Sequence, residues 1–420
     1  MRVLLINKFF FPFGGTETAL FQTAKLLRGK GHQVIFFSMS HAKNIPSQYA
    51  RFFVSRVDFE TVRGWRQKIR GVERILFGRE SRRRLEELLR VEKPDVAHLH
   101  NIYHHLSPGI IATLKKHGIP VVMTLHDYKL VCPAYRLFVH GKTCQRCRNG
   151  RFVWCFLKKC MKNSRSKSLI GSCEAYLHRR HYHLIDRLIV PSHFLQEKIA
   201  ALGFTGTCIH VPNFASMSLL RPASRPTYPK ILFFGRLVEE KGVEVLIDAM
   251  AGLDAECLIV GDGPLEKALR DRARRANRAD IRFLGHQPHR TLASLIRRAT
   301  MVIIPSIWFE NNPFSILEAF ALGVPVIASR IGGIPELIEH GKTGLMFTPG
   351  DPDDLREKIK FLLNCPPERR RLARCAKQWA GNGNGREKHY SQLMAVYRSL
   401  ISENPGAAAP RAESVFADKE

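Results

Sequence analysis

The chain has 420 residues, 45% of them hydrophobic, and carries a formal net charge of +29 with ten cysteines. This length favours two domains, and the apolar content is sufficient for folded cores and excludes a wholly disordered chain. No apolar run approaches the ~20 residues of a membrane-spanning helix, and the N-terminus lacks the small-residue cleavage site of a secretory signal. The charge indicates anionic partners. Because the chain lacks such a signal, we expect the cysteines to be free thiols or metal ligands and the protein to be cytoplasmic.

The first part of the chain, RVLLINKFFFPFGGTETALFQTAKLLRGKGHQVIFFS, reads as strand, glycine loop, helix, glycine and strand. Leu20, Ala24 and Leu27 give the helix an apolar face, and Gly29 and Gly31 end it. The stretches PDVAHLH, PVVMTLHD and RLIVPS predict further strands. Short apolar strands that alternate with amphipathic helices are typical of a parallel sheet covered on both faces.

The same order recurs from residue 230, where KILFFGRLVEEKGVEVLIDAMAGLDAECLIVGDGP precedes the strand-like MVIIP and PVIAS. We therefore predict an α/β protein with two doubly wound domains, residues 1–215 and 225–385, on either side of the proline- and serine-rich stretch 211–230. A helix over 386–402, with packing against the N-terminal domain as one option, and a disordered tail over 403–420 would follow. Ligands of such sheets bind beyond the carboxyl ends of the strands, so we expect a cleft between facing loops.

Chemically notable residues follow several of these strands. They are Gly14-Gly15, His126-Asp127, Arg236, Lys241, Gly261-Asp262-Gly263-Pro264, Glu310 and Glu318. A helix starting at about Pro313 would offer free N–H groups and a positive dipole end to a phosphate. Glu318 inside this helix and Glu310 before it would bind groups on opposite sides of that phosphate. A phosphate between two polyol groups describes a nucleotide-sugar.

Together these motifs resemble the retaining GT-B glycosyltransferases of the family 4 type, also called group 1 glycosyl transferases. The resemblance rests on GRLVEEKGVEVLIDA, IVGDGP, Glu310-x7-Glu318, EAFALGVPVIAS and GGIPELI, and it covers roughly residues 1–402. It implies two Rossmann-like domains facing across a cleft. It also implies sugar transfer from a UDP- or GDP-linked donor to a glycan or lipid-linked glycan, in cell-envelope, exopolysaccharide or lipopolysaccharide synthesis. Many members have an aromatic residue and a glycine where this chain has Asn311-Asn312.

The resemblance assigns the donor diphosphate to Arg236 and Lys241. The backbone N–H groups of Phe314, Ser315 and Ile316 would assist them, and the glycine loop at Gly261 would also border the donor. Such enzymes need no divalent metal or other catalytic cofactor, because fixed cations and a helix end stabilise the departing nucleoside diphosphate.

The remaining implied roles concern the two sugars. Glu318 would bind the ribose hydroxyls, and Glu310 would bind hydroxyls of the transferred sugar. His126 would lie over the anomeric centre with Asp127 beside it, and Gly15 would let the N-terminal loop approach the donor phosphate and the acceptor. Retention is usually ascribed to front-face attack, in which a leaving-group phosphate oxygen takes the acceptor proton.

A basic, cysteine-rich insert spans about residues 132–173. Its cysteines are Cys132, Cys144, Cys147, Cys155, Cys160 and Cys173. A tetrahedral zinc site needs close pairs of thiolates that converge, and Cys144-x2-Cys147 supplies one pair. Cys155-x4-Cys160 is a looser second pair, and Cys132 is a further ligand. A structural zinc site formed by Cys132, Cys144, Cys147, Cys155 and Cys160, free thiols, and disulfides are the three alternatives.

Basic residues also cluster over 56–90, where Trp65, Ile69, Val72 and Leu76 would line one face of an amphipathic helix. A basic helix with tryptophan on its apolar side suits an anionic membrane surface, and packing against the N-terminal sheet explains the pattern equally well. Peripheral attachment to the inner face of the cytoplasmic membrane is therefore one expectation. The alternative functions are a zinc-containing nucleic-acid-binding protein and a phosphorylase-like GT-B enzyme. The first lacks a recognition helix, and the second lacks an evident pyridoxal-phosphate lysine motif.

Overall fold

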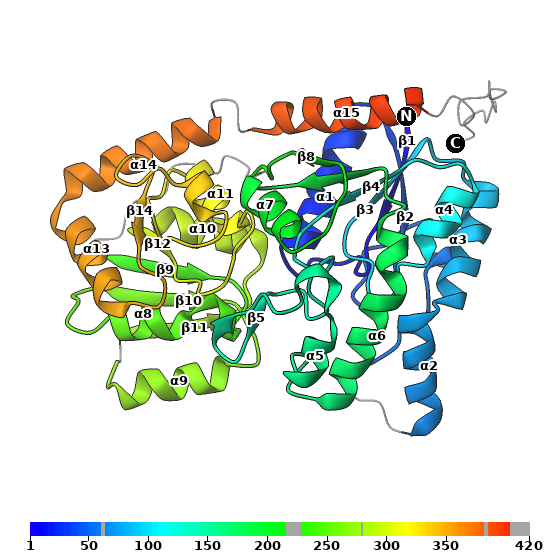
Figure 1. Ribbon diagram of the computed structural model, residues 1–420. Coiled ribbons are helices and arrows are strands. Elements are labelled where there is room, and N and C mark those ends of the chain that lie inside the picture. The colour runs from blue at the N-terminus through cyan, green and yellow to red at the C-terminus, as the bar shows by residue number, and fades with distance from the viewer. Residues whose placement is uncertain (60–63, 216–227, 279, 382–384, 404–420) are drawn as a thin grey trace.

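The computed structural model describes residues 1–420 except 60–63, 216–227, 279, 382–384 and 404–420. The predicted tail therefore lies outside the described residues apart from Glu403, as does most of the predicted linker. Two lobes lie side by side, and each contains a parallel six-stranded sheet with helices on both faces (Figure 1). The prediction of two doubly wound α/β domains with the GT-B architecture is confirmed.

The N-terminal sheet has the strand order β2-β1-β3-β4-β7-β8. Its strands are β1 (Arg2–Ile6), β2 (Gln33–Phe37), β3 (Val96–Leu99), β4 (Val121–Thr124), β7 (Arg187–Val190) and β8 (Cys208–His210). Its helices are α1 (Gly15–Gly29), η1 (Ala50–Phe52), α2 (Trp65–Leu76), α3 (Arg79–Val91), α4 (Ile110–Lys116) and α7 (His193–Ala201). An insert between β4 and β7 holds the antiparallel hairpin β5 (Phe138–Val139) and β6 (Lys142–Thr143), with η2 (Arg148–Gly150), α5 (Val153–Leu157) and α6 (Arg165–Tyr182).

The C-terminal sheet has the order β11-β10-β9-β12-β13-β14. Its strands are β9 (Lys230–Phe234), β10 (Glu256–Val260), β11 (Ile281–Gly285), β12 (Met301–Ile304), β13 (Val326–Ser329) and β14 (Leu345–Phe347). Its helices are η3 (Glu239–Lys241), α8 (Val243–Ala249), α9 (Glu266–Arg275), α10 (His289–Arg298), α11 (Phe314–Ala321), α12 (Ile334–Leu337), α13 (Pro352–Asn364) and α14 (Pro366–Gly381).

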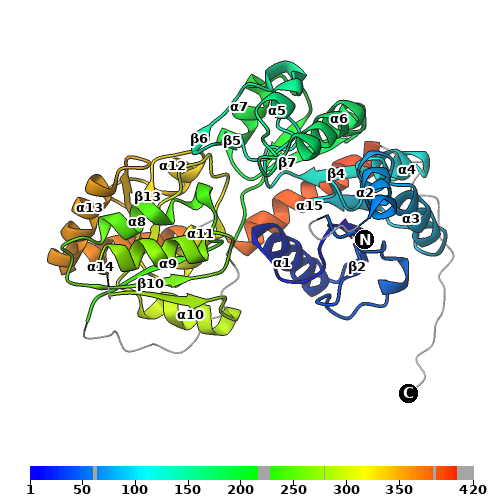
Figure 2. The ribbon, with the colours of Figure 1, turned by 90° about the horizontal axis from the view of Figure 1, so that it is seen from below.

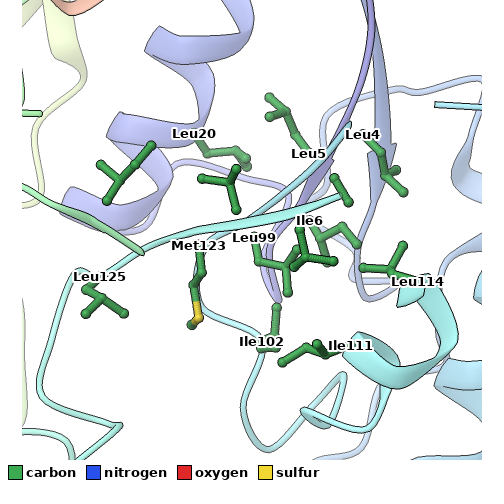
Figure 3. Close-up of a cluster of buried hydrophobic side chains, with 14 of the residues drawn as sticks. Leu4, Leu5, Ile6, Leu20, Leu99, Ile102, Ile111, Leu114, Met123 and Leu125 are labelled. Carbon is green, nitrogen blue, oxygen red and sulfur yellow. The ribbon is translucent and has the colours of Figure 1, made fainter. Parts of the chain in front are cut away.

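Both sheets are buried on two faces, which explains their unbroken apolar strands. On β9, Ile231 and Phe233 enter one hydrophobic core while Leu232 and Phe234 enter another. Successive side chains of a strand point to opposite faces, so a strand covered on both sides must be apolar throughout. In the N-terminal core, Figure 3 shows side chains of the strands packed between those of the flanking helices.

The last helix, α15 (Arg386–Glu403), leaves the C-terminal lobe and lies along the N-terminal lobe (Figure 1). Its Tyr390 hydroxyl is 2.8 Å from His32 Nε2, and its Tyr397 hydroxyl is 2.6 Å from His98 Nδ1. Tyr397 is fully buried. The end of the described chain thus joins the two lobes by a second connection.

Candidate functional site

Three of the predicted site residues follow the two strands at which the C-terminal sheet reverses its order. In the C-terminal sheet the chain runs from β9 outward to β11 and then returns to the other side of β9 as β12. Open α/β sheets bind ligands beyond the strand ends at such a switch point. Arg236 and Lys241 follow β9, and Glu310 follows β12. Topology alone therefore brings these three residues to one edge of the sheet.

Lys241 and Glu310 form a close ion pair at this edge. The distance from Lys241 Nζ to Glu310 Oε1 is 2.6 Å, and Ser306 Oγ donates to the same oxygen at 2.6 Å. Burial opposes ionisation of the Glu310 carboxyl, but the charge of Lys241 and these hydrogen bonds hold its pKa below the ordinary value. Glu310 is therefore an ionised carboxylate that fixes the position of the Lys241 ammonium.

The GGIPELI motif supports the backbone at Glu310. Gly333 N–H donates to the Glu310 carbonyl at 2.7 Å. Gly332 has φ of 62°, and a Cβ there would lie 2.2 Å from the Glu310 carbonyl oxygen. A side chain at Gly332 would therefore displace the loop that carries Glu310, which explains a glycine at this point of the motif.

The IVGDGP motif supports the loop that carries Arg236 in the same way. Gly261 has φ of 130°, and a Cβ there would lie 1.9 Å from the Gly235 carbonyl oxygen. Leu237 N–H donates to the Asp262 carbonyl at 2.7 Å, so the two loops are directly bonded. Gly261 thus acts by letting the backbone next to Arg236 pack closely.

We expect Gly261→Ala to destabilise the protein by at least about 2 kcal/mol more than Gly285→Ala does, because both introduce backbone strain but only the first adds a clash. Gly285 has φ of 65° with open space around the position of a Cβ. Urea unfolding followed by tryptophan fluorescence measures both variants. Equal losses of stability would contradict the proposed packing of the Gly261 loop against Gly235.

Helix α11 places Glu318 close to its buried face. The N-cap residue that precedes it, Pro313, makes no side-chain hydrogen bond to the helix, so the helix start has uncapped N–H groups. One of the three predicted N–H donors is already engaged, since Ile316 N–H donates to the Pro313 carbonyl at 3.2 Å. The N–H groups of Phe314 and Ser315 remain as the predicted donors. Burial raises the pKa of Glu318 to about 7.

The start of α11 faces the start of α1 in the other lobe (Figures 1 and 2). A Cβ on Gly15 would lie 3.4 Å from Phe314 Cδ2, so a larger residue there would press on α11. The guanidinium carbon of Arg236 lies 5.7 Å from the centre of the Phe13 ring, which is half exposed. The structure therefore brings Gly15, Arg236 and Phe314 together from two lobes.

His126 lies just after β4 and is held by a neighbouring histidine. His126 Nε2 lies 2.8 Å from His100 Nδ1, and the two rings stack at 5.1 Å. The rings of His98 and His100 also stack, at 4.6 Å. Burial lowers the pKa of His126 to about 3, so its imidazole is neutral at physiological pH. These contacts fix the orientation of His126.

Asp127 is anchored inside the N-terminal lobe. One carboxylate oxygen accepts the Tyr103 hydroxyl, and the other accepts Lys129 N–H at 3.0 Å. Burial raises the pKa of Asp127, and these hydrogen bonds oppose the rise. Both carboxylate oxygens thus accept hydrogen bonds within the N-terminal lobe, so Asp127 is placed to hold the loop after His126 in position.

Asn311 explains the departure from the pattern after the first glutamate. Its Nδ2 donates to the Leu125 carbonyl at 3.0 Å, and its Oδ1 accepts Ser192 Oγ at 2.6 Å. Beside it, the Tyr128 hydroxyl donates to the Phe309 carbonyl at 3.0 Å. Asn311 and Tyr128 therefore tie the Glu310 loop to the N-terminal lobe. Sequence reasoning missed both roles, although the departure at Asn311 was a visible signal.

Five predicted zinc ligands come together elsewhere in the fold. Cys132, Cys144, Cys147, Cys155 and Cys160 line one cavity of about 20 Å³. All five cysteines are unbridged in this structure. Within the described residues, no group of three or more His, Cys, Asp or Glu side chains is arranged so that it could hold a metal ion.

The sequence matches two family models whose ranges together span most of the chain. Residues 13–215 match "Glycosyltransferase Family 4", and residues 221–379 match "Glycosyl transferases group 1". The chain belongs to the group 1, family 4 glycosyltransferases. The predicted family is therefore confirmed, and the two matched ranges correspond to the two lobes.

Individual relatives of this glycosyltransferase agree with the assignment. An uncharacterised glycosyltransferase of Methanocaldococcus jannaschii is 34% identical over 215 residues, which is 51% of this chain and 60% of that protein. The matched stretch thus spans less than two thirds of that relative. Sucrose-phosphate synthase of Thermosynechococcus elongatus aligns over 96% of this chain and 99% of its own, with 19% identity and a TM-score of 0.75.

A second solved structure, HepE of Anabaena in complex with UDP and glucose, covers 95% of this chain and 100% of its own. Its identity is 17% and its TM-score is 0.68, so the likeness concerns the fold. Among helices in the part of this glycosyltransferase that the structure describes, none is long and apolar enough to cross a bilayer.

Proposed function

We propose that this glycosyltransferase moves a sugar, with retention of configuration, from a UDP- or GDP-linked donor to a glycan or lipid-linked glycan of the cell envelope or an exported polysaccharide. The observation that carries the proposal is the Lys241–Glu310 ion pair at the switch point of the C-terminal sheet. It lies on the loops beside α11, and Phe314 at the start of that helix would lie 3.4 Å from a Cβ on Gly15 of the other lobe. Fixed cations beside a helix start suit a diphosphate.

In this proposal the donor diphosphate binds between Arg236, Lys241 and the first N–H groups of α11. The phosphate oxygens compete with Glu310 for the Lys241 ammonium, and Ser306 continues to donate to Glu310. The Glu310 carboxylate, no longer paired with Lys241, then accepts hydrogen bonds from hydroxyls of the transferred sugar. Positive groups placed before the reaction stabilise the charge that develops on the departing nucleoside diphosphate, so no divalent metal is required.

His126 then contributes as a hydrogen-bonding group and not as a general acid. A pKa of about 3 keeps its imidazole neutral at physiological pH. The His100 contact at Nε2 leaves Nδ1 as the ring nitrogen that can meet the sugar. A leaving-group phosphate oxygen takes the acceptor proton in the front-face mechanism that we adopt for this chain.

A panel of UDP- and GDP-sugars tests the proposal through donor hydrolysis, thermal shift and transfer to glycan acceptors. We expect at least one nucleotide-sugar to raise the melting temperature and to be hydrolysed, and Arg236→Ala to abolish both signals. Arg274→Ala, on the exposed side of α9, is the control and should change neither. Inorganic phosphate as the only productive acceptor would instead support the phosphorylase alternative. A panel without any binding or turnover would contradict the proposal.

The N-terminal lobe also has a surface that fits peripheral contact with an anionic membrane. Trp65 and Ile69 of α2 are 67% and 59% exposed, and Val72 and Leu76 of the same predicted face are partly covered. In Figure 1, α2, α5 and α6 project from the same side of the N-terminal sheet. Exposed arginines and lysines of α2 flank Trp65 and Ile69, an arrangement typical of helices that bind anionic lipid.

We expect Trp65→Ser/Ile69→Ser to reduce binding to vesicles containing about 30% anionic lipid by about tenfold or more, because both side chains lose apolar burial. Phe361→Ser removes a similarly exposed side chain from the C-terminal lobe and is the control. Vesicle sedimentation at low and high salt measures the bound fraction. Unchanged binding in the double variant would exclude α2 as the contact.

A further inference from the structure

The cysteine cavity has dimensions and walls suited to a single ion. Its volume of about 20 Å³ holds one sphere of the size of a water molecule. Besides the five cysteines it is lined by Ala134, Leu137, Phe138 and Val139. A buried water needs two to four polar partners, which these apolar side chains do not offer. Sulfur atoms are the only side-chain ligands that the lining offers.

The cysteines come from separate parts of the insert. Cys132 precedes the β5–β6 hairpin, Cys147 follows it, and Cys155 and Cys160 lie in α5 and just after it. Cys155 is fully buried, and Cys132 and Cys147 are buried as well. A small region of short elements has little apolar core of its own, as the four-residue buried cluster of Cys147, Phe152, Cys155 and Ala175 illustrates. Segments of this kind are commonly held by metal ions or disulfides.

We propose that this cavity is a structural zinc site in which four of the five thiols, as thiolates, bind one Zn²⁺ tetrahedrally. Zinc–sulfur distances in such sites are about 2.3 Å, so the proposal requires four sulfur atoms to lie closer to a common centre than they do in this structure. This requirement reconciles the two observations: the five cysteines surround one cavity, and they are not arranged in this structure as metal ligands.

The surroundings suit the negative charge of a four-thiolate zinc site. Backbone N–H groups of Leu137, Ala134 and Arg136 donate to the Cys132 sulfur. The positive charges of Arg136 and Lys158 act on Cys160. Such hydrogen bonds and cations stabilise thiolates.

The position of the site indicates what the metal would stabilise. Arg136, next to the hairpin, pairs with Glu240 at 3.2 Å, and a Cβ on Gly141 at the hairpin turn would lie 3.4 Å from Glu239 Oε1. Glu239 and Glu240 directly precede Lys241 in η3. The hairpin lies between the two lobes in Figure 1. A metal at the cysteine cavity would therefore hold the β5–β6 hairpin of the N-terminal lobe against the loop that carries Lys241.

The test is elemental analysis of the full-length protein, purified in reducing buffer without chelators and without a polyhistidine tag. We expect one zinc per chain, removal by a strong chelator with a fall in melting temperature of about 10 °C, and recovery on adding Zn²⁺. Trypsin should cut the metal-free protein within residues 142–160 and leave the zinc-bound protein intact. The double variant Cys132→Ser/Cys147→Ser leaves three cysteines at the cavity and should lose zinc. Cys173→Ser, on the exposed side of α6, is the matched control and should keep it.

Two results would overturn the proposal, and both are readable on the wild-type chain even if the cysteine variants fail to fold. The first is protein without zinc that takes up none when Zn²⁺ is added, with all ten thiols titratable after denaturation. The second is fewer than ten titratable thiols in protein purified and denatured without reductant, which would show disulfides in place of a metal.

Discussion

Replacing Lys241 with methionine should lower kcat/KM for sugar transfer by about 100- to 1,000-fold. The substitution removes a fixed positive charge from the departing diphosphate, and the loss of one such preorganised group typically has this size. It also leaves Glu310 as a buried carboxylate without its cation, which costs about 3 kcal/mol of stability. Steady-state kinetics with the active donor and urea unfolding measure the two effects.

The double variant Lys241→Met/Glu310→Gln separates the two effects. It removes the unpaired charge, so stability should return to within about 1 kcal/mol of the wild type while transfer stays impaired. Lys342→Met breaks a similar pair, with Glu339 at 3.0 Å, but both partners are exposed, and neither activity nor stability should change measurably. Full activity in the double variant would show that Lys241 does not act in the donor site.

Replacing Glu318 with glutamine should make the protein more stable above pH 7 and at the same time weaken donor binding. Burial raises the folded-state pKa of Glu318 to about 7 from its ordinary value of 4.5. The free energy of unfolding of the wild type therefore falls as pH rises from about 4.5 to 7. Above that range it is lower by the full amount, about 3 kcal/mol. Glutamine carries no such penalty, so the two proteins should be equally stable near pH 4.5.

Donor affinity should change in the opposite direction. An ionised Glu318 accepts the ribose hydroxyls, and a hydrogen bond to a charged group contributes about 1.5–3 kcal/mol, so glutamine should weaken binding by roughly 10- to 100-fold at pH 8. Unfolding at several pH values and calorimetric titration of the nucleotide measure both quantities. Glu357→Gln, an exposed substitution on α13, is the control. A variant with unchanged affinity would show that Glu318 does not contact the ribose.

The strands were predictable because sheets buried on both faces require unbroken apolar runs, as β9 and β12 illustrate. Once the strands are known, the loops at their carboxyl ends follow, and with them the neighbourhood of Lys241 and Glu310. The contact of Lys241 with Glu310, 69 residues apart in the sequence, is then a consequence of adjacent strands in one sheet.

Contacts between lobes were not predictable in the same way. Asn311 bonds to Leu125 and Ser192 only because the two lobes meet there, and no local pattern encodes that meeting. The hydrogen bond from Ile316 N–H to the Pro313 carbonyl depends on the geometry of the first helical turn. The sequence spacing of the cysteines likewise permitted several pairings, and their convergence on one cavity depends on how the hairpin and α5 fold together.

A crystal structure with an intact nucleotide-sugar donor is the most direct test of the central claim, which is that one diphosphate site is made by the two lobes jointly. The account predicts phosphate oxygens within hydrogen-bonding distance of Arg236, Lys241 and the N–H groups of Phe314 and Ser315, with Gly15 facing them from the other lobe. A donor bound away from these groups, with Lys241 still paired to Glu310, would contradict it.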